Sequence, residues 1–509
     1  MMKWVDNLLN RVTMYRLILY YLIALLGVAL LFAFAGLSDQ DPYALLFSTG
    51  FLVGVCALTN WIFAQTFAAP PNVESTYISA LILALIISPL ESYQDLWFLG
   101  WAAILAMASK YIVAIKHKHL FNPVAFAVAL TYFTINQSAS WWVGNIQLLP
   151  FVLLGGILIV RKTQRFALVY SFFVSALVTL LAFGLLERDG APAMVESFQR
   201  TVYYSPLFFF AFVILTEPLT MPPTRRTQII YGALVGVVGA PQFHLGSFYP
   251  TPEVAILVGN LFAYIVSPKA KLILRLKERI QLSADVYDFI FAPTPRLAFA
   301  PGQYMEWTLG HADPDQRGNR RYFTLASAPT EDELRIGVKF YERSSSFKQA
   351  LLTMEPEHEI VAAQLAGDFV LPANLQQHCV LIAGGIGITP YRSMIKYLLD
   401  TGQRRPITLI YACRTVDDFV YHGLFTQARR AWGLQTIYTV TDRSKVPAWW
   451  TGHVGYITPQ LIKTAVPDYK ECLFYISGPN RMVNAFRTVL RQLQVKNSQI
   501  KTDFFSGLA

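Results

Sequence analysis

The chain has 509 residues, of which 54% are hydrophobic and only 15% are charged, and its mean hydropathy is +0.39. This composition is too apolar for an ordinary soluble enzyme and excludes an intrinsically disordered chain. The formal net charge is +10. In a protein so rich in aliphatic and aromatic residues, a basic excess is typical of cytoplasmic loops between membrane spans, and we expect no nucleic-acid partner.

Apolar stretches fill the chain up to about Pro268. Ten candidate spans are predicted, at 16–36, 44–66, 76–91, 95–115, 120–134, 143–160, 166–186, 204–221, 228–241 and 253–267. Several are shorter than the roughly 20 residues of a full crossing, so tilted, broken or re-entrant segments stay open. The first span lacks a small-residue cleavage site, and we expect it to be retained.

The charges of the loops indicate the orientation of these spans. Lys and Arg gather at one set of alternate loops, as at Arg161, Arg225 and Lys271, whereas the opposite loops hold mainly acidic residues, as at Asp39 and Glu187. Basic loops are typical of the cytoplasmic side. We therefore expect an inner-membrane protein with both termini, and everything after Pro268, in the cytoplasm.

Redox ligands in the sequence are few. The four cysteines stand alone and form no CxxC pair: Cys56, Cys379, Cys413 and Cys472. This pattern indicates neither a disulfide framework nor a cysteine-ligated zinc or iron–sulfur site, and no metal site is predicted. The membrane half has three histidines, His117, His119 and His244, which are not spaced for paired haem ligation.

Beyond a basic connector at 269–279, residues 280–366 show short alternating runs separated by turns, which predicts a small β-barrel. Three segments in it carry chemistry, at 301–304, 321–327 and 343–347. An arginine beside a hydroxyl suits a phosphate and a ring nitrogen, and serines that open a helix suit a pyrophosphate. A plain helix N-cap is the alternative interpretation of those serines.

The pattern after Cys379 changes to strand, glycine turn and helix, with a strand at 380–383, a turn at 384–390 and a helix at 391–399. Further strands are predicted at 407–411, 436–440 and 473–476. Glycines let a backbone approach a diphosphate, and open parallel sheets bind ligands at the carboxyl ends of their strands. A nucleotide site is therefore expected there.

Segment 275–509 resembles the ferredoxin–NADP reductase superfamily. Its RxYS motif appears as Arg321, Phe323 and Thr324; GGxGxTP is complete at 384–390; the usual CGP is Ser477-Gly478-Pro479; and the chain ends on an aromatic tail with Phe504 and Phe505. The resemblance implies that Arg321 contacts the flavin phosphates, that Phe323 flanks the isoalloxazine and that Thr324 hydrogen-bonds near N5.

The resemblance also implies the site as a whole. Thr324 and Ser477 are the expected catalytic residues. The expected cofactor-binding residues are Arg321, Tyr322, Phe323, Thr324, Ser344, Ser345, Ser346, Gly384, Gly385, Gly387, Thr389, Arg414, Gly478, Pro479, Phe504 and Phe505. FAD is favoured over FMN. NADH and NADPH both stay open, because Arg414 suits either a 2′-phosphate or a solvated position.

Two polar segments stand out in the membrane half. Asn122-Pro123 has the pattern of an N-cap and first residue of a helix, and 216–222 combines a carboxylate with prolines that break a helix. Such sites often line cofactor or ion cavities, although ordinary helix ends at the cytoplasmic face are the alternative. The candidate residues for a membrane cofactor or ion site are Asn122, Thr216, Glu217 and Thr220.

Together with segments 74–81 and 231–236, these two polar segments resemble the family that contains the B subunit of the sodium-pumping NADH:quinone reductase and the D subunit of the Rnf complex. The resemblance covers most of 70–268. It implies ten spans in two five-helix halves and an FMN esterified to a threonine. The motif for that FMN is absent; the nearest string, at 136–142, has Ser140 in place of the acceptor. A second flavin, FMN or riboflavin, is left open.

The expected fold is an α-helical polytopic membrane domain at 1–268, an FAD-binding β-barrel at 275–372 and an NAD(P)-binding α/β domain at 373–509. The expected function is a membrane-bound NAD(P)H:acceptor oxidoreductase that passes electrons through FAD to a quinone or a second flavin in the lipid bilayer. Two alternatives stay open: redox-driven ion movement with Glu217 as the coupling carboxylate, and a non-redox transporter or anchor with a reductase module.

Overall fold

The computed structural model describes residues 4–5, 9, 12–67, 73–115, 118–186, 190–267, 271–293, 297–311, 314–315, 318–342 and 344–503. The chain divides into two compact units, one up to Lys271 and the other from Leu272 onward. The first unit is helical, and the second contains two β-sheets with helices. Each unit is described by itself.

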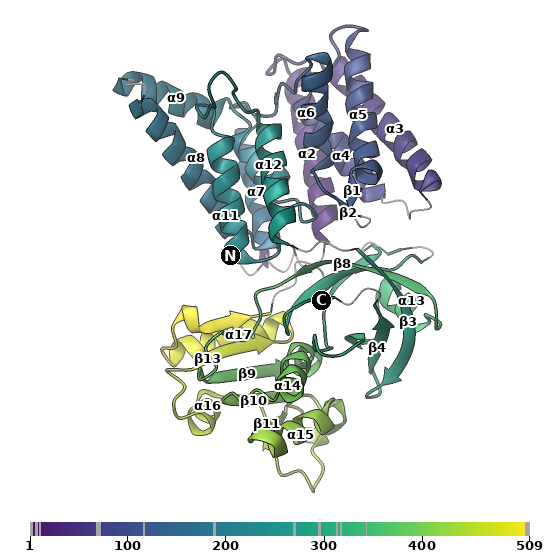
Figure 1. Ribbon diagram of the computed structural model, residues 1–509, viewed down its shortest axis with the longest axis vertical. Coiled ribbons are helices and arrows are strands. Elements are labelled where there is room, and N and C mark those ends of the chain that lie inside the picture. Colours follow the sequence, from purple (N-terminus) through teal and green to yellow (C-terminus); the bar gives the residue numbers. More distant parts are fainter. Residues whose placement is uncertain are drawn as a thin grey trace. The chain divides into compact units, whose positions relative to one another are not determined.

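The helical unit contains long apolar helices in two groups, α2 to α6 and α7 to α12 (Figure 1). Its helices are α2 (Met14–Phe34), α3 (Pro42–Thr66), α4 (Val73–Ile86), α5 (Asp95–Ile112), α6 (Pro123–Ile135), α7 (Leu149–Thr163), α8 (Phe166–Leu186), α9 (Ala191–Tyr203), α10 (Leu207–Phe209), the π-helix η1 (Phe210–Ile214), α11 (Arg225–Val238) and α12 (Pro252–Val266). Three described helices, α2, α3 and α8, are long and apolar enough to cross a membrane. A short hairpin of β1 (Ala114–Ile115) and β2 (Lys118–His119) follows α5.

Small residues set the packing of α8 against α11. A Cβ atom on Gly232 would lie 2.5 Å from the carbonyl oxygen of Leu168, and one on Gly236 would lie 2.5 Å from that of Phe172. Only glycine permits this approach, which is the usual way for apolar helices to pack closely in a membrane. The two helices accordingly lie side by side along their lengths (Figure 1).

The region before α11 differs from the prediction. Helix α9 lies where no element was expected; it carries an exposed ion pair of Glu196 with Arg200 and half-exposed Phe198. The helix within the predicted span at 204–221 is shorter than the span, because it begins only after Pro206 and its π-helical part ends before Pro218. Proline at these positions removes backbone donors and so interrupts a helix.

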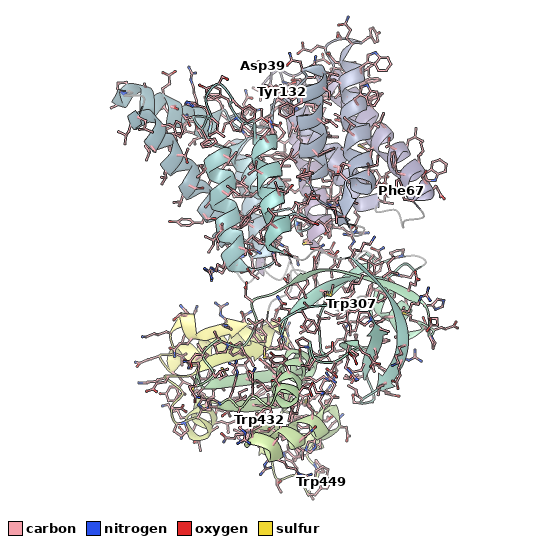
Figure 2. All side chains as sticks on the ribbon, viewed as in Figure 1. Asp39, Phe67, Tyr132, Trp307, Trp432 and Trp449 are labelled. Carbon is pink, nitrogen blue, oxygen red and sulfur yellow. The ribbon has the colours of Figure 1, made fainter. Side chains whose placement is uncertain are left out.

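The first sheet of the second unit is antiparallel and curled. Its strand order is β6-β5-β8-β3-β4-β7, and the outer strands β6 and β7 contact each other. The strands are β3 (Leu272–Gln281), β4 (Val286–Ala292), β5 (Tyr304–Thr308), β6 (Arg320–Thr324), β7 (Leu334–Lys339) and β8 (Glu359–Ala366). Trp307 is fully buried inside the curl (Figure 2).

One sequence interpretation in this region is wrong. The segment taken as a basic connector forms most of strand β3, which pairs with β4 and β8. Leu272, Leu274 and Leu276 are buried on one face, while Ile273 and Arg275 between them are exposed. This alternation with a period of two residues is that of a half-buried strand, and the high charge of the segment concealed it.

The second sheet is parallel, in the order β12-β11-β10-β9-β13-β14. Its strands are β9 (Cys379–Gly384), β10 (Ile407–Cys413), β11 (Gln435–Val440), β12 (His453–Val454), β13 (Leu473–Ser477) and β14 (Ile500–Thr502). Helices α14 (Thr389–Thr401) and α15 (His422–Trp432) pack on one face, and α16 (Pro459–Ala465) and α17 (Asn480–Gln492) on the other. The strands and the helix predicted from the sequence for 380–476 are confirmed.

Candidate functional site

The glycine turn after β9 lies against the end of β13. A Cβ atom on Gly387 would lie 2.4 Å from the carbonyl oxygen of Ser477, and Gly385 has a φ of +52°. Both positions therefore require glycine. The turn leads directly into the 13-residue helix α14, which begins at Thr389. The turn itself is the 3-10 helix η2 (Gly385–Ile388), so the helical run starts on glycine, and such a helix start, with no side chain between backbone and ligand, suits a diphosphate.

The two predicted catalytic residues, Thr324 and Ser477, both form a hydrogen bond with a third residue, Asp503. Thr324 ends strand β6 and Ser477 ends strand β13, so they come from different sheets. Ser477 Oγ donates to Asp503 Oδ2 at 3.1 Å, and Thr324 Oγ1 donates to the same oxygen at 3.5 Å. Asp503 follows β14, and its N–H donates to the carbonyl of Ile476. One carboxylate oxygen thus links both hydroxyls.

Sequence reasoning missed Asp503, which stands just before the aromatic tail. Burial raises the pKa of this carboxyl group to about 7, although the hydrogen bonds from Ser477 and Thr324 oppose the shift. A carboxyl group that titrates near neutrality can supply or accept a proton. The signal in the sequence was an acidic residue one position after the final strand, which is visible only once the strand is known to lie beside β13.

The phosphate-type donors predicted at Arg321 and Ser346 converge on Asp315. Ser346 N donates to Asp315 Oδ2 at 3.1 Å, and Arg321 Nη2 lies 3.8 Å from Asp315 Oδ1. Arg321 is buried, and its guanidinium lies over the ring of Phe347. The guanidinium of Arg321 and the N–H at the start of α13 both face the carboxylate of Asp315. Donors that already contact one anionic group also suit a phosphate.

The remaining predicted residues of the curled sheet divide into two groups. The ring of Phe323 lies 6.0 Å from that of Phe347, on the side of Arg321. Tyr322 points to the other face of β6, where its hydroxyl donates to Glu306. Ser345 is the N-cap of α13 (Ser346–Leu352), as the alternative interpretation had it, and Ser344 bonds to the backbone of Tyr341.

The remaining predicted residues of the parallel sheet lie at its carboxyl edge or beyond the described chain. Gly478 has a φ of +154° and packs on Gly384, and Pro479 caps α17. The Arg414 side chain is 74% exposed, and its Nε lies 3.6 Å from Asp442 Oδ2. Phe504 and Phe505 lie outside the described residues.

A partly buried ionic network joins elements of the curled sheet to helices of the parallel-sheet domain. Arg392 of α14 donates to both carboxylate oxygens of Glu331, at 2.7 and 2.9 Å. The ion pair with Arg392 lowers the pKa of Glu331 against the opposing effect of burial. Asp288 of β4 accepts from Arg335 and from the hydroxyl of Tyr421. Paired, bidentate contacts of this kind hold a geometry firmly.

A second polar cluster lies between the apolar helices. Asn122 caps α6, as predicted, and its Nδ2 donates to Glu217 Oε2 at 2.8 Å. Thr220 Oγ1 donates to the same oxygen at 2.9 Å, and His119 Nε2 lies 3.8 Å from Glu217 Oε1. The hydroxyl of Thr216 instead bonds to the carbonyl of Phe212. Three of the four predicted residues are therefore brought together.

Asn260 of α12 completes this cluster and was missed. Its Oδ1 accepts from Asn122 N at 2.7 Å, and its Nδ2 donates to the hydroxyl of Tyr231 at 3.1 Å. Asn260 is fully buried. A single amide inside an apolar helix was the signal in the sequence, because such a group needs partners from neighbouring helices.

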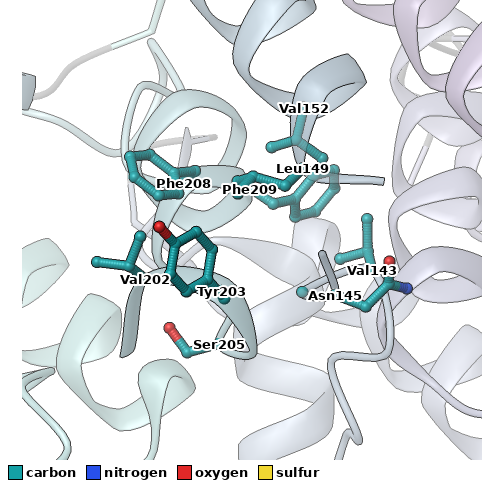
Figure 3. Close-up of a pocket in the computed structure, with 10 residues that line it drawn as sticks. Val143, Asn145, Leu149, Val152, Val202, Tyr203, Ser205, Phe208 and Phe209 are labelled. Atoms are coloured by element: carbon teal, nitrogen blue, oxygen red, sulfur yellow. The ribbon is translucent and has the colours of Figure 1, made fainter. Parts of the chain in front are cut away.

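The predicted outer loop contributes further polar contacts. Ser140 Oγ donates to the carbonyl of Ile86, and Trp141 Nε1 donates to the buried carboxylate of Glu253 at 2.7 Å. A small recess lies beyond this loop, lined by residues such as Asn145, Tyr203 and Phe208 (Figure 3). It leaves about 10 Å³ for the centre of a water-sized molecule, which is room for about one water, and we assign it no cofactor.

Two family models match this chain, one within each of the two units. Residues 143–270 match the model of the NQR2, RnfD, RnfE family, and residues 381–488 match the oxidoreductase NAD-binding domain. The first match covers α7 to α12 and the second covers the parallel sheet from β9 to α17.

Curated relatives match less than half of the chain. A flavohemoprotein of Pseudomonas putida is 30% identical over 242 residues, which are 46% of this chain and 59% of that protein. NADH-cytochrome b5 reductase 1 of Coccidioides immitis is 27% identical over 235 residues, 44% of this chain and 75% of that protein. The chain spans 58–59% of the length of four of the flavohemoproteins it matches.

A solved FAD/NAD-binding domain of nitric oxide dioxygenase from Vibrio cholerae is 20% identical, with a TM-score of 0.41 over 46% of this chain and 98% of that one. The family models and the curated relatives agree with the architecture of the two units. Part of the helical unit is thus similar to the NQR2, RnfD, RnfE family, part of the second unit is similar to the oxidoreductase NAD-binding domain, and less than half of the chain is similar to flavohemoproteins and to an NADH-cytochrome b5 reductase.

Proposed function

We propose that this protein is a membrane-bound oxidoreductase that takes electrons from NADH or NADPH through FAD and passes them to an acceptor in the lipid bilayer. The proposed division is a transmembrane domain at 1–268 with ten spans in two five-helix halves, an FAD-binding barrel at 275–372 and an NAD(P)-binding domain at 373–509. One observation carries the reductase part: Asp503 joins Thr324 and Ser477 at the edge where the glycine turn lies.

Each residue of the reductase site has a proposed task. Arg321 and the start of α13 would hold the phosphates of FAD, since they already share the carboxylate of Asp315. Gly384, Gly385, Gly387 and Thr389 would admit the diphosphate of the nicotinamide nucleotide, together with Gly478 and Pro479. Phe323 would flank the flavin ring, and Phe504 and Phe505 would cover it. Bound FAD would accept hydride from the nucleotide.

The proton chemistry falls to the chain's own residues. Thr324 would hydrogen-bond the flavin ring, Ser477 would orient the nicotinamide, and Asp503 would hold both hydroxyls and exchange a proton near neutral pH. A carboxyl group serves as a proton donor best when its pKa lies near the working pH. Activity should therefore fall as Asp503 loses its proton.

The acceptor is proposed to be a quinone, or a second flavin of FMN or riboflavin type in the membrane domain. The polar cluster of Asn122, Glu217 and Thr220 supports a site among the helices, because buried polar groups there are costly and usually functional. Inner-membrane residence with the reductase domain in the cytoplasm is supported by the basic loops, as at Arg225 and Arg226.

One preparation tests the main proposal. The full chain, purified in detergent, should carry one FAD, which NADH or NADPH reduces in rapid mixing and which a soluble quinone reoxidises. A flavin count of two, one of them held after acid denaturation, would assign a covalent membrane flavin. A preparation that binds FAD but oxidises neither nucleotide with quinone or ferricyanide would contradict the proposal.

A second candidate function is redox-driven ion movement with Glu217 as the coupling carboxylate. It is favoured by the convergence of an amide, a hydroxyl and an imidazole on this one acid among apolar helices. In sealed vesicles, Glu217→Gln should keep NAD(P)H:ferricyanide activity and lose the ion gradient. The control is Glu196→Gln, which changes an exposed acid of α9. Absence of a gradient with the parent protein would eliminate this candidate.

A further inference from the structure

Three side chains with metal-binding atoms meet at the amino edge of the parallel sheet. His378 precedes β9, Cys472 precedes β13, and Asp468 lies in the turn between α16 and β13. Strands β9 and β13 are neighbours, with Leu473 opposite Cys379. This edge is opposite to the carboxyl edge that holds the nucleotide turn, so the cluster is separate from the reductase site.

The ligand atoms of this cluster, one each from His378, Asp468 and Cys472, all lie within 4.8 Å of one another. His378 Nδ1 is 2.7 Å from Asp468 Oδ2, and Cys472 Sγ lies 3.4 Å from the carbonyl oxygen of Asp468. Cys472 is fully buried, while the Asp468 side chain is 48% exposed. The cluster is therefore both ordered and open to solvent on one side.

Both nitrogens of the His378 imidazole have partners. Nε2 lies 3.1 Å from Thr408 Oγ1, which donates to Gln435 Oε1 at 3.2 Å, and Nδ1 lies beside Asp468 Oδ2. A tautomer with its proton on Nε2 donates to Thr408 and turns the lone pair of Nδ1 toward the carboxylate, which is the arrangement that a metal cation needs.

Neighbouring bonds keep the three ligand segments in place. Gln377 Nε2 donates to the carbonyl of Glu471 at 2.8 Å, which ties the segment before β9 to the segment before β13. Gln499 Nε2 donates to the carbonyl of Cys472 at 3.1 Å. Metal-binding histidines typically donate their second N–H to a fixed oxygen, which here is the hydroxyl of Thr408.

We propose that His378 Nδ1, Asp468 and Cys472 Sγ bind one divalent zinc ion, with water as the fourth ligand. Nitrogen, oxygen and sulfur donors together suit zinc, which prefers four tetrahedral ligands about 2.0–2.3 Å away. Binding replaces the thiol proton of Cys472, so one proton is released and nothing is oxidised or reduced. The ion would clamp the starts of β9 and β13, whose far ends carry Gly384 and Ser477.

Sequence reasoning predicted no metal site because it looked for paired cysteines. This set has a single cysteine, and its histidine lies in a segment far from the other two ligands. Only the pairing of β9 with β13 brings the segments together. The inference is independent of the reductase proposal, because it concerns the opposite edge of the sheet.

The test uses the full chain in detergent, freed of metal with a chelator and titrated with Co²⁺. We expect a thiolate-to-cobalt absorption band in difference spectra that saturates at one ion per chain and disappears when Zn²⁺ is added. Cys472→Ser and His378→Gln should each remove the band and weaken Zn²⁺ binding at least tenfold. Cys413→Ser, a buried cysteine at the other edge, is the matched control and should keep the band.

A second variant and a second readout keep the test decisive if Cys472→Ser folds poorly. Asp468→Asn changes a half-exposed side chain at equal volume, and it should abolish the rise in melting temperature that Zn²⁺ gives the parent protein. NAD(P)H oxidation by ferricyanide should be unchanged in this variant. Absence of the cobalt band in the parent, or a band that persists in Cys472→Ser, would overturn the proposed zinc site.

Discussion

The reductase site and the membrane cluster each centre on one carboxylate, but the groups around it differ. Asp503 receives hydrogen bonds from the hydroxyls of Ser477 and Thr324. Glu217 receives them from Asn122 and Thr220, with the imidazole of His119 nearby. The hydrogen bonds from the two hydroxyls lower the pKa of Asp503 less than burial raises it, and the pKa is about 7 as a result. Amide and imidazole donors together are a set that stabilises a carboxylate anion.

The two sites are also held in place by different means. The reductase site is aligned by backbone: strand ends, a glycine turn and the register of β9 with β13. The membrane cluster is held by side-chain hydrogen bonds between helices, above all through Asn260. Disturbance of backbone packing should therefore affect the first site most, and loss of a single amide should affect the second.

The largest expected effect comes from Gly387→Ala. The new Cβ would lie 2.4 Å from the carbonyl oxygen of Ser477, a backbone atom that cannot move without displacing β13. We expect NAD(P)H:ferricyanide activity to fall by about 100-fold, roughly 2.7 kcal/mol, as measured by steady-state kinetics. Gly423→Ala is the control, because nothing lies within 4 Å of its new Cβ atom. Equal activity of the two variants would refute the role of the turn.

Asn260→Leu should destabilise the helical unit by about 2–6 kcal/mol. The substitution leaves the buried N–H of Asn122 and the hydroxyl of Tyr231 without these bonds, and each loss costs about 1–3 kcal/mol. Denaturant unfolding in detergent measures the loss, and ferricyanide activity should persist because the reductase site is untouched. Leu261→Ala, at an exposed position of α12, is the control. If Asn260→Leu is as stable as this control, the hydrogen bonds of Asn260 do not stabilise the helical unit.

Asp503→Asn should change the pH dependence of stability and of turnover. The raised pKa means that the native state holds its proton more tightly than the unfolded state, so stability is greatest below about pH 4 and is lost as the pH rises toward 7. The variant should thus nearly match the parent at pH 4 and exceed it by about 4 kcal/mol at pH 8. Its activity should lose any decline centred near pH 7. Parallel stability curves for the two proteins would remove Asp503 as a titrating group.

Arg414→Ala should have the smallest effect. The side chain is largely exposed, and its Nε lies 3.6 Å from Asp442 Oδ2. Exposed pairs of this kind contribute little, about 0–1 kcal/mol. We expect KM for NADH to change less than twofold and KM for NADPH to rise about threefold if Arg414 meets a 2′-phosphate. Equal changes for both nucleotides would place the arginine outside nucleotide selection.

Local patterns predicted much of the fold and part of the candidate site. The alternation and glycine turn after Cys379 predicted β9, α14 and the strands beyond them, because each depends on residues close together in the chain. Asn122 and Pro123 likewise predicted the start of α6. Strand β3 was missed because its exposed face is charged, and α9 was missed because it is too polar for a span.

Neighbouring residues alone predicted an apolar helical half, a strand-and-helix half, and the residues that end the strands at the carboxyl edge of the parallel sheet, because backbone periodicity is a local pattern. The folded chain was needed to show which distant groups contact one another: Asp503 with Thr324, Asn260 with Asn122, and His378 with Cys472. These contacts depend on the register of paired strands and the packing of helices. Such long-range contacts leave no fixed spacing in a single chain.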